Sequence, residues 1–399
     1  MRILRVAQDI FPETVGGAPY HIHALSRDQA ARGHDVTVLT VSNSVDEQET
    51  VQRNGYTLIR QPPKVEVLGN QLFTKTIGIL RDREDYDVVH AHSHLFFSTN
   101  VAAAYCRWKG IPLALTCHGL NSQRGPFWFS RAHLRTLGKW TYDSANVTFC
   151  YTDVEQTKLR ELGVKADIAV VNNGVDTERF SPSGRKHERI EAAAGPAIVF
   201  AGRLVDGKRP QDVLTAFETI QDRCPDAELF FCGDGPMRYR LEETAAQTGL
   251  DDAVTFLGRV PYSEMPAVFR AADLFVLPSR TEGFPRTVLE ALSCETPVVS
   301  SNLEQTAKIV EQTGATVEVG DVEGLAAAVS DLVEDEQLLA DLGRHGRRIV
   351  TTRYDWADTV RETTNVLGQV AGVIDPTTTE PKEPSSPQIP VGQDEIDAK

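Results

Sequence analysis

The stretch AIVFAGRLVDGKRPQDVLTAFETI, residues 197–220, carries the repeating unit from which the fold is built. AIVFAGR (197–203) is apolar enough to form a strand buried on both faces, and PQDVLTAFETI (210–220) has apolar residues at helical spacing. A buried strand followed closely by a helix is typical of a parallel, doubly wound sheet. This stretch therefore predicts an α/β domain.

The same unit recurs on both sides of this stretch. Downstream, we expect strands at AELFFCG (227–233), AVTFLGR (253–259), DLFVLP (273–278) and PVVSS (297–301). Upstream, we expect strands at Ile3–Ala7, Asp35–Val41, DVVHAH (87–92), PLALTCH (112–118), VTFCY (147–151) and IAVV (168–171). The two sets predict two Rossmann-like domains facing across a cleft. Ligands of such folds bind at the carboxyl ends of the strands.

A polar stretch between the two sets of strands separates the expected domains. We expect an N-terminal domain over residues 1–182 and a C-terminal domain over residues 193–352. Residues 353–373 are expected to form a C-terminal helix. Residues 374–399 contain five prolines and few large apolar groups, a composition that predicts a disordered acidic tail.

The charge of the chain is acidic and unevenly spread. Its 399 residues include 56 acidic and 41 basic side chains, a formal net charge of −15. Residues 1–180 carry a net +1, residues 181–373 a net −12 and residues 374–399 a net −4. The acidic balance argues against nucleic acid as a partner, because phosphate neutralisation needs a basic surface.

Cysteine usage and hydropathy indicate the compartment. The six cysteines form no C-x-x-C pair, which favours free thiols in a reducing environment. The N-terminus lacks the apolar stretch of a signal peptide, and no apolar run approaches the ~18 residues that span a membrane. We therefore expect a cytoplasmic protein, either free or attached to the inner face of the membrane.

The sharpest motif is TEGFPRTVLEA, residues 281–291. Glu282 ends the loop after a strand, Pro285 fits the first turn of a helix, and Glu290 lies inside that helix. The backbone N–H groups at the helix start attract phosphate, and the two carboxylates can accept hydrogen bonds from sugar and ribose hydroxyls. Taken alone, the two glutamates are better explained as surface charges. Together with the loops below, the motif suits a nucleoside-diphosphate sugar.

Two loops after strands of the second set add cations and glycines. Arg203 ends a strand and Lys208 follows in a Gly-containing loop, so both suit a diphosphate leaving group and could neutralise it without a metal ion. In GDGP (233–236), Gly233 and Gly235 permit close backbone approach to a ligand. A plain tight turn explains GDGP almost as well.

The first domain offers a glycine loop and a histidine at the same cleft. Gly16 and Gly17 precede a helix, where their N–H groups could meet an anion or a sugar. His118 ends the buried strand of LTCHGL and is expected to face the cleft. The alternative for His118 is a strand-end histidine that is satisfied within the core.

In this order and spacing, the motifs resemble those of the retaining glycosyltransferases of family four. The resemblance covers roughly residues 1–370 and includes NGVDTERF at 173–180. It implies the GT-B fold, in which a C-terminal helix, here residues 353–373, crosses back to the first domain. It also implies transfer of a sugar from a UDP- or GDP-linked donor to a hydroxyl of a glycan, lipid-linked or small-molecule acceptor, with retention at the anomeric carbon and no metal cofactor.

The resemblance assigns roles to matching residues. Glu290 would bind the nucleotide ribose, and Glu282 would contact the transferred sugar. Arg203 and Lys208 would hold the diphosphate, and His118 would contact a donor-sugar hydroxyl. The remaining donor-side residues would be Gly16, Gly17, Gly233, Phe284, Pro285 and Arg286. Since no side chain of the motif is an obvious nucleophile, the resemblance implies a front-face displacement in which the leaving diphosphate helps to deprotonate the acceptor.

The chain departs from the family pattern at two places. Pro285 stands where the family often has glycine, so one backbone N–H is absent, and Arg286 could supply a replacement charge. After PVVSS, Glu304 and Gln305 stand where the family often has a glycine pair. The donor contacts of that second loop are therefore left open.

Three other functions remain to be separated from this one. A nucleotide-sugar epimerase on the same fold would change the donor without an acceptor. An NAD-dependent oxidoreductase is disfavoured because neither glycine loop reads G-x-G-x-x-G. A catalytically silent sugar-binding or partner-binding protein is disfavoured by the intact set of two glutamates and two cations.

Two patterns suggest a metal, but each has a plainer explanation that we favour. His90, His92 and His94 alternate along a strand and share one face, as zinc ligands can, yet no carboxylate is spaced to complete the site. Asp85 and Asp87 form a D-x-D pattern that fits the solvated start of a buried strand. We expect no metal.

Residues 124–140, RGPFWFSRAHLRTLGKW, hold four basic groups and no acidic one among four aromatic residues. If the segment is helical, Arg131, Arg135 and Lys139 form one stripe. Such a stripe could contact anionic lipid headgroups or a lipid-linked acceptor. The alternative, which we favour, is an ordinary helix whose aromatic residues pack inward.

Overall fold

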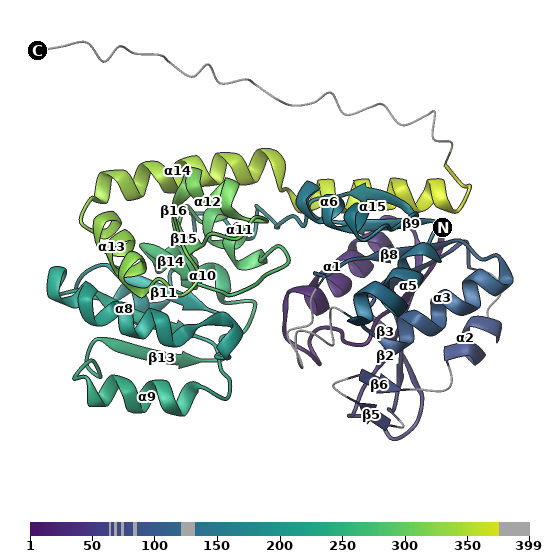
Figure 1. The fold of residues 1–399 in the computed structure, drawn as a ribbon, viewed down its shortest axis with the longest axis horizontal. Helices are drawn as coiled ribbons and strands as arrows, with labels where there is room; N and C mark the ends of the chain where they lie inside the picture. The colour runs from purple at the N-terminus through teal and green to yellow at the C-terminus, as the bar shows by residue number, and fades with distance from the viewer. Residues whose placement is uncertain (64, 68–69, 73–75, 83–85, 121–131, 375–399) are drawn as a thin grey trace, which may run out of the picture.

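The computed structural model shows two α/β domains with a long helix returning from the second to the first (Figure 1). The described residues are 1–63, 65–67, 70–72, 76–82, 86–120 and 132–374. Each domain has a largely parallel sheet with a hydrophobic core on both faces. This is the predicted architecture.

The N-terminal domain is built on an eight-stranded sheet in the order β10-β9-β8-β7-β1-β2-β4-β3. The strands are β1 (Arg2–Val6), β2 (Asp35–Val41), β3 (Glu49–Arg53), β4 (Tyr56–Gln61), β7 (Val88–His92), β8 (Leu113–Thr116), β9 (Val147–Cys150) and β10 (Asp167–Val170). Only the edge strand β3 pairs antiparallel within this described sheet, in a hairpin with β4. The hairpin was not predicted, although its turn residues Asn54 and Gly55 both have positive φ, as a two-residue hairpin turn requires.

Helices and a small hairpin complete this domain. They are α1 (Gly17–Ala31), β5 (Val65–Val67), β6 (Asn70–Leu72), α2 (Thr76–Asp82), α3 (Phe97–Lys109), the π-helical turn η1 (Leu134–Gly138), α5 (Lys139–Asp143) and α6 (Asp153–Glu161). Thr152 caps α6 by accepting a hydrogen bond from the Glu155 amide, which explains why the helix begins directly after β9.

The C-terminal domain has a six-stranded parallel sheet in the order β13-β12-β11-β14-β15-β16. The strands are β11 (Ala197–Ala201), β12 (Glu228–Cys232), β13 (Val254–Gly258), β14 (Leu274–Leu277), β15 (Val298–Ser301) and β16 (Gly314–Val317). The helices are α7 (Glu188–Glu191), the 3₁₀ turn η2 (Asp206–Lys208), α8 (Pro210–Arg223), α9 (Arg238–Gln247), α10 (Met265–Ala271), α11 (Arg286–Ser293), α12 (Ala307–Thr313), α13 (Val322–Val333) and α14 (Glu336–Arg353).

Phe230 and Phe231 show why the strands of this domain are continuously apolar. These neighbours on β12 point to opposite faces of the sheet, and both are fully buried. Phe230 belongs to the core that contains Leu289 of α11, whereas Phe231 belongs to the core that contains Phe217 of α8. The two cores fix the sheet, and with it the loops that leave the carboxyl ends of its strands.

The last helix, α15 (Trp356–Val370), crosses back to the N-terminal domain, as expected. Figure 1 shows it lying over that domain, and Leu367 is fully buried in a core shared with Ile3 and Ile22. The indole N–H of Trp356 donates to Asp28 of α1 at 2.6 Å. The final helix therefore ties the two domains together.

The domain limits predicted from the sequence fall between the two sheets. The last strand of the first sheet ends at Val170, and the first strand of the second begins at Ala197. We propose residues 1–182 and 193–352 as the two domains on this basis. The predicted disordered tail lies outside the described residues, apart from its first residue. Among the described helices, none is long and apolar enough to cross a membrane.

Candidate active site

The loops at the carboxyl ends of the two sheets meet at Gly119 and Gly283. Gly119 follows β8 of the N-terminal domain, and Gly283 follows β14 of the C-terminal domain. A Cβ atom on Gly283 would lie 3.6 Å from the Gly119 nitrogen and 3.6 Å from the His118 carbonyl oxygen. The two backbones are therefore in contact, which places His118 beside the motif of residues 281–291.

The Lys208 ammonium forms an ion pair with Glu282 Oε1, and both side chains are largely buried. Lys208 ends η2 in the loop after β11, and Arg280 pairs with Asp206 of the same turn at 2.9 Å. Arg203 is exposed and forms no ion pair with the described residues. The structure thus pairs Lys208 with Glu282, both predicted site residues, whereas the second predicted cation, Arg203, lies in solvent.

The glycines of GDGP are required by packing between two loops. A Cβ atom on Gly233 would lie 1.8 Å from the Gly202 carbonyl oxygen, and one on Gly235 would lie 2.4 Å from the Leu204 carbonyl oxygen. The Leu204 amide donates to the Asp234 carbonyl at 3.0 Å, which holds the loops together. This contact explains both glycines without a ligand, and a donor contact at Gly233 stays a prediction.

His118 is hydrogen-bonded at both ring nitrogens. His92 Nδ1 lies 2.9 Å from His118 Nε2, and the Tyr151 hydroxyl lies 2.9 Å from His118 Nδ1. His92 Nε2 is buried and has no hydrogen-bond partner among the described residues. Because a buried N–H without a partner is rarer than an unfilled acceptor, we assign the proton of His92 to Nδ1, which donates to His118. His118 then donates from Nδ1 to the Tyr151 oxygen.

Burial keeps these rings uncharged. It lowers the pKa of His118 to about 3. Burial also holds the pKa of His90, His92 and His21 well below the usual range, and the neighbouring Arg5 guanidinium adds to this effect. The N-terminal side of the domain junction therefore presents neutral hydrogen-bonding groups.

The alternating histidines do not converge on a metal site. His90 Nε2 lies 2.7 Å from Thr116 Oγ1, whereas His94 Nδ1 lies 2.7 Å from the Tyr142 hydroxyl. His92 is instead hydrogen-bonded to His118. In the part of the chain that the structure describes, no group of three or more His, Cys, Asp or Glu side chains is placed to hold a metal ion.

Glu290 lies inside the protein, at the junction between the two domains. Its side chain is 2% exposed, and Oε1 accepts a hydrogen bond from the Tyr262 hydroxyl at 2.7 Å. Burial raises the pKa of Glu290, whereas Arg286 and the Tyr262 hydrogen bond oppose the rise. The Tyr262 ring packs against Tyr20 of α1, with ring centroids 4.0 Å apart. A ribose that binds Glu290 would therefore lie beside contacts between the domains.

The start of α11 differs from the prediction by one residue. Pro285 is the N-cap, and the helix begins at Arg286, so the proline lies just outside the first turn. The error is small because a fixed proline φ suits both positions. Phe284 is buried and stacks on Tyr354, with ring centroids 5.6 Å apart. In this structure Phe284 anchors the loop from within.

The glycine loop of the N-terminal domain reaches the same helix. Gly16 is the N-cap of α1 and Gly17 begins it. A Cβ atom on Gly17 would lie 3.8 Å from Arg286 Cδ. The predicted replacement charge of Arg286 is therefore not in solvent, because its side chain is only 6% exposed and points into the domain junction.

Several residues of this junction were missed in the sequence: Tyr20, Tyr151, Tyr262 and Trp356. Tyr20 lies in the sequence segment of Gly16 and Gly17, but only the glycines of that segment gave a signal. Tyr151 and Tyr262 stand in segments without a recognisable motif. Asn173 opens the recognised motif NGVDTERF, and its Oδ1 lies 2.9 Å from His21 Nδ1.

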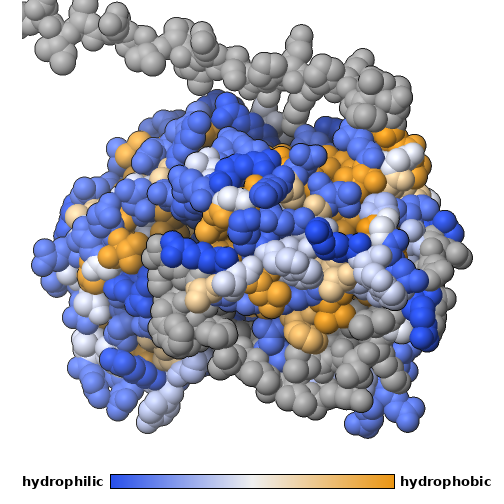
Figure 2. All heavy atoms as spheres, turned by 45° about the vertical axis from the view of Figure 1, so that its right-hand side comes forward, coloured by the Kyte–Doolittle hydropathy of each residue, from blue (hydrophilic) through white to orange (hydrophobic). Residues whose placement is uncertain are grey.

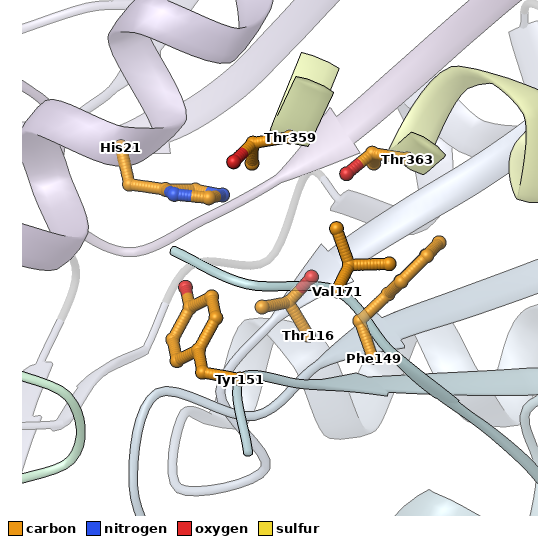
Figure 3. A pocket seen from close by; sticks show the side chains of 7 residues that line it. All are labelled: His21, Thr116, Phe149, Tyr151, Val171, Thr359 and Thr363. Atoms are coloured by element: carbon orange, nitrogen blue, oxygen red, sulfur yellow. The ribbon is translucent and has the colours of Figure 1, made fainter. Parts of the chain in front are cut away.

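A small cavity lies behind the histidines, between the first sheet and α15 (Figure 3). Its lining residues are His21, Thr116, Phe149, Tyr151, Val171, Thr359 and Thr363. In Figure 3 the Tyr151 ring points toward His21, and their ring centroids are 5.6 Å apart. The cavity holds about one water molecule, which is too little for a sugar.

Two sequence patterns fall partly outside the described residues. Residues 121–131 and Asp85 are not described, whereas Asp87 pairs with Arg2 at 3.0 Å, as the start of a solvated strand would. In the described remainder of the basic aromatic segment, Leu137 and Trp140 are exposed. Figure 2 shows a mostly hydrophilic face on which hydrophobic side chains form separate groups. The predicted membrane contact therefore stays a prediction.

Both halves of the chain match models of known protein families. Residues 15–179 match "Glycosyltransferase Family 4", and residues 185–349 match "Glycosyl transferases group 1". A glycogen synthase of Mycobacterium tuberculosis is 30% identical over 397 residues, covering 92% of this chain and 94% of that one. A GDP-mannose-dependent alpha-(1-6)-phosphatidylinositol monomannoside mannosyltransferase of the same species is 28% identical, covering 89% and 95%.

Solved structures show the same fold at lower identity. Sucrose-phosphate synthase from Thermosynechococcus elongatus superimposes with a TM-score of 0.78 at 21% identity, covering 94% of this chain and all of that one. Anabaena HepE in complex with UDP-glucose gives a TM-score of 0.76 at 21% identity, covering 92% and 100%.

Proposed function

Because the chain belongs to glycosyltransferase family 4 and is a glycosyltransferase with the GT-B fold, we propose that it transfers a sugar from a UDP- or GDP-linked donor to a hydroxyl acceptor. We further propose that the anomeric configuration is retained. The observation that carries this proposal is the Lys208–Glu282 ion pair, which lies next to the contact of Gly283 with His118 and Gly119. The donor would bind where the two domains meet.

The charged side chains fit a front-face displacement. The bond between the anomeric carbon and the diphosphate oxygen breaks while the acceptor oxygen attacks the same face. The acceptor proton passes to the leaving diphosphate oxygen. Lys208, together with Arg203, would stabilise the negative charge that develops on the diphosphate. Glu282 orients the Lys208 ammonium and would accept a hydrogen bond from the transferred sugar.

His118 would act as a neutral hydrogen-bonding group. Since both ring nitrogens are already engaged, a donor-sugar hydroxyl must exchange with His92 or with Tyr151. The proton order assigned above leaves the Tyr151 O–H hydrogen free to be donated. We propose that the donor hydroxyl takes the place of Tyr151 on His118 and that Tyr151 stays within reach of the sugar.

The relatives support two donor classes and two acceptor classes. One named relative is dependent on GDP-mannose and acts on a phosphatidylinositol mannoside, another is a glycogen synthase, and HepE was solved with UDP-glucose. We propose a glycan or lipid-linked acceptor, with a small molecule as the remaining possibility. The named relatives give no support to an epimerase.

The test is transfer from a panel of UDP- and GDP-sugars by wild-type protein and Glu282→Gln. We expect transfer by the wild type and a large loss in Glu282→Gln, since the variant cannot hold Lys208 by charge. The exposed Glu311→Gln on α12 is the control. An altered nucleotide sugar formed from the donor alone, without any acceptor, would instead establish the epimerase.

We also propose that the reaction needs no metal, because the Lys208 and Arg203 cations can neutralise the diphosphate. Activity should persist after dialysis against EDTA. A loss that added Mg²⁺ or Mn²⁺ restores would contradict this. We propose a cytoplasmic location. Peripheral membrane contact near Trp140 is the less favoured alternative, and comparing the binding of wild type and Trp140→Ser to anionic vesicles would test it.

A further inference from the structure

Arg286 lies where four parts of the chain meet. It is the first residue of α11 and lies four residues before Glu290. Its side chain reaches Gly17 at the start of α1, the segment after β10, and α15. It is a buried arginine in a motif whose other charged members, Glu282 and Glu290, are assigned to the donor.

The guanidinium is fixed on the side away from Glu290. Its Nη1 donates to the Gly174 carbonyl at 2.9 Å and to Asn173 Oδ1 at 3.3 Å. Its plane lies against two aromatic rings, 5.1 Å from the centroid of Tyr20 and 5.3 Å from that of Trp356. The N-terminal domain and the returning helix therefore determine where the guanidinium sits.

The opposite edge of the guanidinium faces Glu290. Arg286 Nε lies 3.6 Å from Glu290 Oε1, and it is buried without a hydrogen-bond acceptor among the described residues. The same oxygen, Oε1, accepts the hydrogen bond from Tyr262. A shift of well under 1 Å would let Nε donate to Oε1, since an N–H···O bond needs about 2.9 Å. The Glu290 carboxylate therefore accepts one hydrogen bond, from Tyr262, and lies just beyond hydrogen-bond distance of a second donor, Arg286 Nε.

We infer that Arg286 is a positioning residue that ties the ribose-binding carboxylate of Glu290 to the domain junction, so that nucleotide binding and domain closure are coupled. The inference rests on the proposed function, in which Glu290 binds the ribose. Tyr20 and Trp356 determine the position of the Arg286 guanidinium. The guanidinium and Tyr262 in turn determine the position of the Glu290 carboxylate, which accepts hydrogen bonds from the nucleotide. Movement of the N-terminal domain then changes the site on the C-terminal domain.

The alternative is that Arg286 only holds the domains together. The two roles differ in what happens to the charge of Glu290. The groups that face Glu290 are Arg286 and Cys294 on its own helix, Tyr262 after β13, and Arg179 between the domains, which all interact with it electrostatically. Burial raises the pKa of this carboxyl, and the positive charge of Arg286 opposes that rise more than any other group does.

Replacing Arg286 by methionine keeps the volume and removes the opposing charge. The pKa of Glu290 then rises further, and the carboxyl gains a proton as the pH falls. A protonated carboxyl accepts ribose hydrogen bonds more weakly. Nucleotide affinity of Arg286→Met should therefore fall more steeply with decreasing pH than that of the wild type. Arg286→Lys keeps the charge and should keep the wild-type pH profile.

The experiment measures binding of UDP and of GDP by calorimetry, between about pH 6 and about pH 8. The variants are Arg286→Met, Arg286→Lys and Tyr262→Phe. The matched control is Arg270→Met on α10, because Arg270 likewise donates to backbone carbonyls between the domains, at Ser181 (2.6 Å) and Arg179 (2.9 Å). Among the described residues, Arg270 forms no hydrogen bond or ion pair with Glu290, so its loss tests domain packing without removing a cation that contacts Glu290.

We expect about 10-fold weaker binding of the preferred nucleotide to Arg286→Met at neutral pH, the usual effect of a hydrogen bond to a charged group. The loss should grow toward low pH, and binding to Arg270→Met should match the wild type. Equal affinity and a flat pH profile in Arg286→Met overturn the inference. If Arg286→Met does not fold, unchanged nucleotide binding in Tyr262→Phe, which removes the hydrogen bond to Glu290 Oε1, overturns it. Wild-type protein that binds neither nucleotide refutes the proposed function itself.

Discussion

The two domains bring opposite kinds of side chain to their junction. The C-terminal domain contributes charge, in the Lys208–Glu282 pair and in the closely spaced Arg286 and Glu290. The N-terminal domain contributes the neutral ring of His118, which is hydrogen-bonded on both sides.

This difference between the two sides shows that the net charge of a domain does not predict the charge of its site residues. The site residues instead have the charges that the proposed reaction requires. Residues 181–373 carry a net −12, yet they hold the cations that the proposed mechanism requires for an anionic leaving group. A hydroxyl acceptor enters without charge, so the other side can consist of neutral groups. The Lys208–Glu282 ion pair is largely buried and is therefore screened little by salt, which keeps the charge of Lys208 effective within an acidic domain.

The largest effect is expected at Lys208, on the charged side. Lys208→Met removes the cation that would stabilise the leaving diphosphate, and it leaves Glu282 without its partner. We expect kcat to fall about 100-fold to 1000-fold, as when one donor to a developing oxyanion is lost. Steady-state kinetics with the preferred donor would measure this.

Arg209→Met is the matched control, because Arg209 follows Lys208 in the chain but pairs with Asp212 at 2.5 Å. Its kcat should stay close to the wild-type value. Equal losses in both variants would show that the charge of the loop matters and not the Lys208–Glu282 pair.

The next effect concerns the loop that carries Gly233. A Cβ atom on Gly233 would overlap the Gly202 carbonyl oxygen, so Gly233→Ala forces the two loops of the charged side apart. We expect the free energy of unfolding to fall by about 3 kcal/mol, as in overpacked sites. Denaturant titration would measure it.

Gly207→Ala is the control for this change, since a Cβ atom there meets nothing within 4 Å. Normal stability of Gly233→Ala would show that the two loops do not pack as described. The requirement for glycine would then come from the donor.

On the neutral side, a smaller effect is expected on thermal stability when the pH falls, because of His118. The pKa of His118 is about 3 in the folded protein and close to the ordinary 6.5 in the unfolded chain. Below 6.5 the unfolded chain binds a proton that the folded protein does not, so stability present above that pH is lost as the pH falls toward 3. We expect the Tm to fall progressively below about pH 6.5.

Calorimetry of wild type and His118→Gln would test this assignment, with the partly exposed His345→Gln as the control. His118→Gln should flatten the decline in Tm, and His345→Gln should not. Identical slopes in all three proteins would mean that His118 is not kept neutral by burial.

The smallest effect on stability is expected at Gly17. A Cβ atom there would lie at ordinary contact distance, 3.8 Å, from Arg286 Cδ. Gly17→Ala should therefore change the free energy of unfolding by no more than about 0.5 kcal/mol, the usual range for a site without strain. Transfer activity measured on the same protein would show whether a ligand approaches this backbone. Full activity would exclude Gly17 from the site.

The architecture could be predicted because its cause is local. Buried strands alternating with helices predict parallel sheets, and the segments around Phe200, Phe230 and Phe275 follow that rule. The antiparallel hairpin at Asn54–Gly55 was missed because its strands are short and mixed in polarity. Pro285 was placed one residue inside its helix, since proline suits both positions.

The site could be predicted only in part. The sequence motifs predicted Glu282, Lys208 and His118 as site residues, and the fold places these residues close together. The sequence could not show that Tyr262 contacts Glu290 or that Trp356 contacts Arg286. These contacts join residues that lie far apart in the chain and meet only through side-chain packing. Arg286 itself was expected to offer charge to the donor, and the packing of two aromatic rings turned it inward.

Although β3, β4 and β16 were not among the predicted strands, the sequence by itself determined two parallel sheets and the presence of a nucleotide-sugar motif. These follow from hydrophobic periodicity and from residue types at short spacing. Tertiary structure alone decided that Lys208 holds Glu282, that both nitrogens of His118 are engaged, and that Arg286 lies in the domain junction. Such pairings depend on which loops meet when two separately folded sheets close on one another, and short-range sequence patterns carry no information about that.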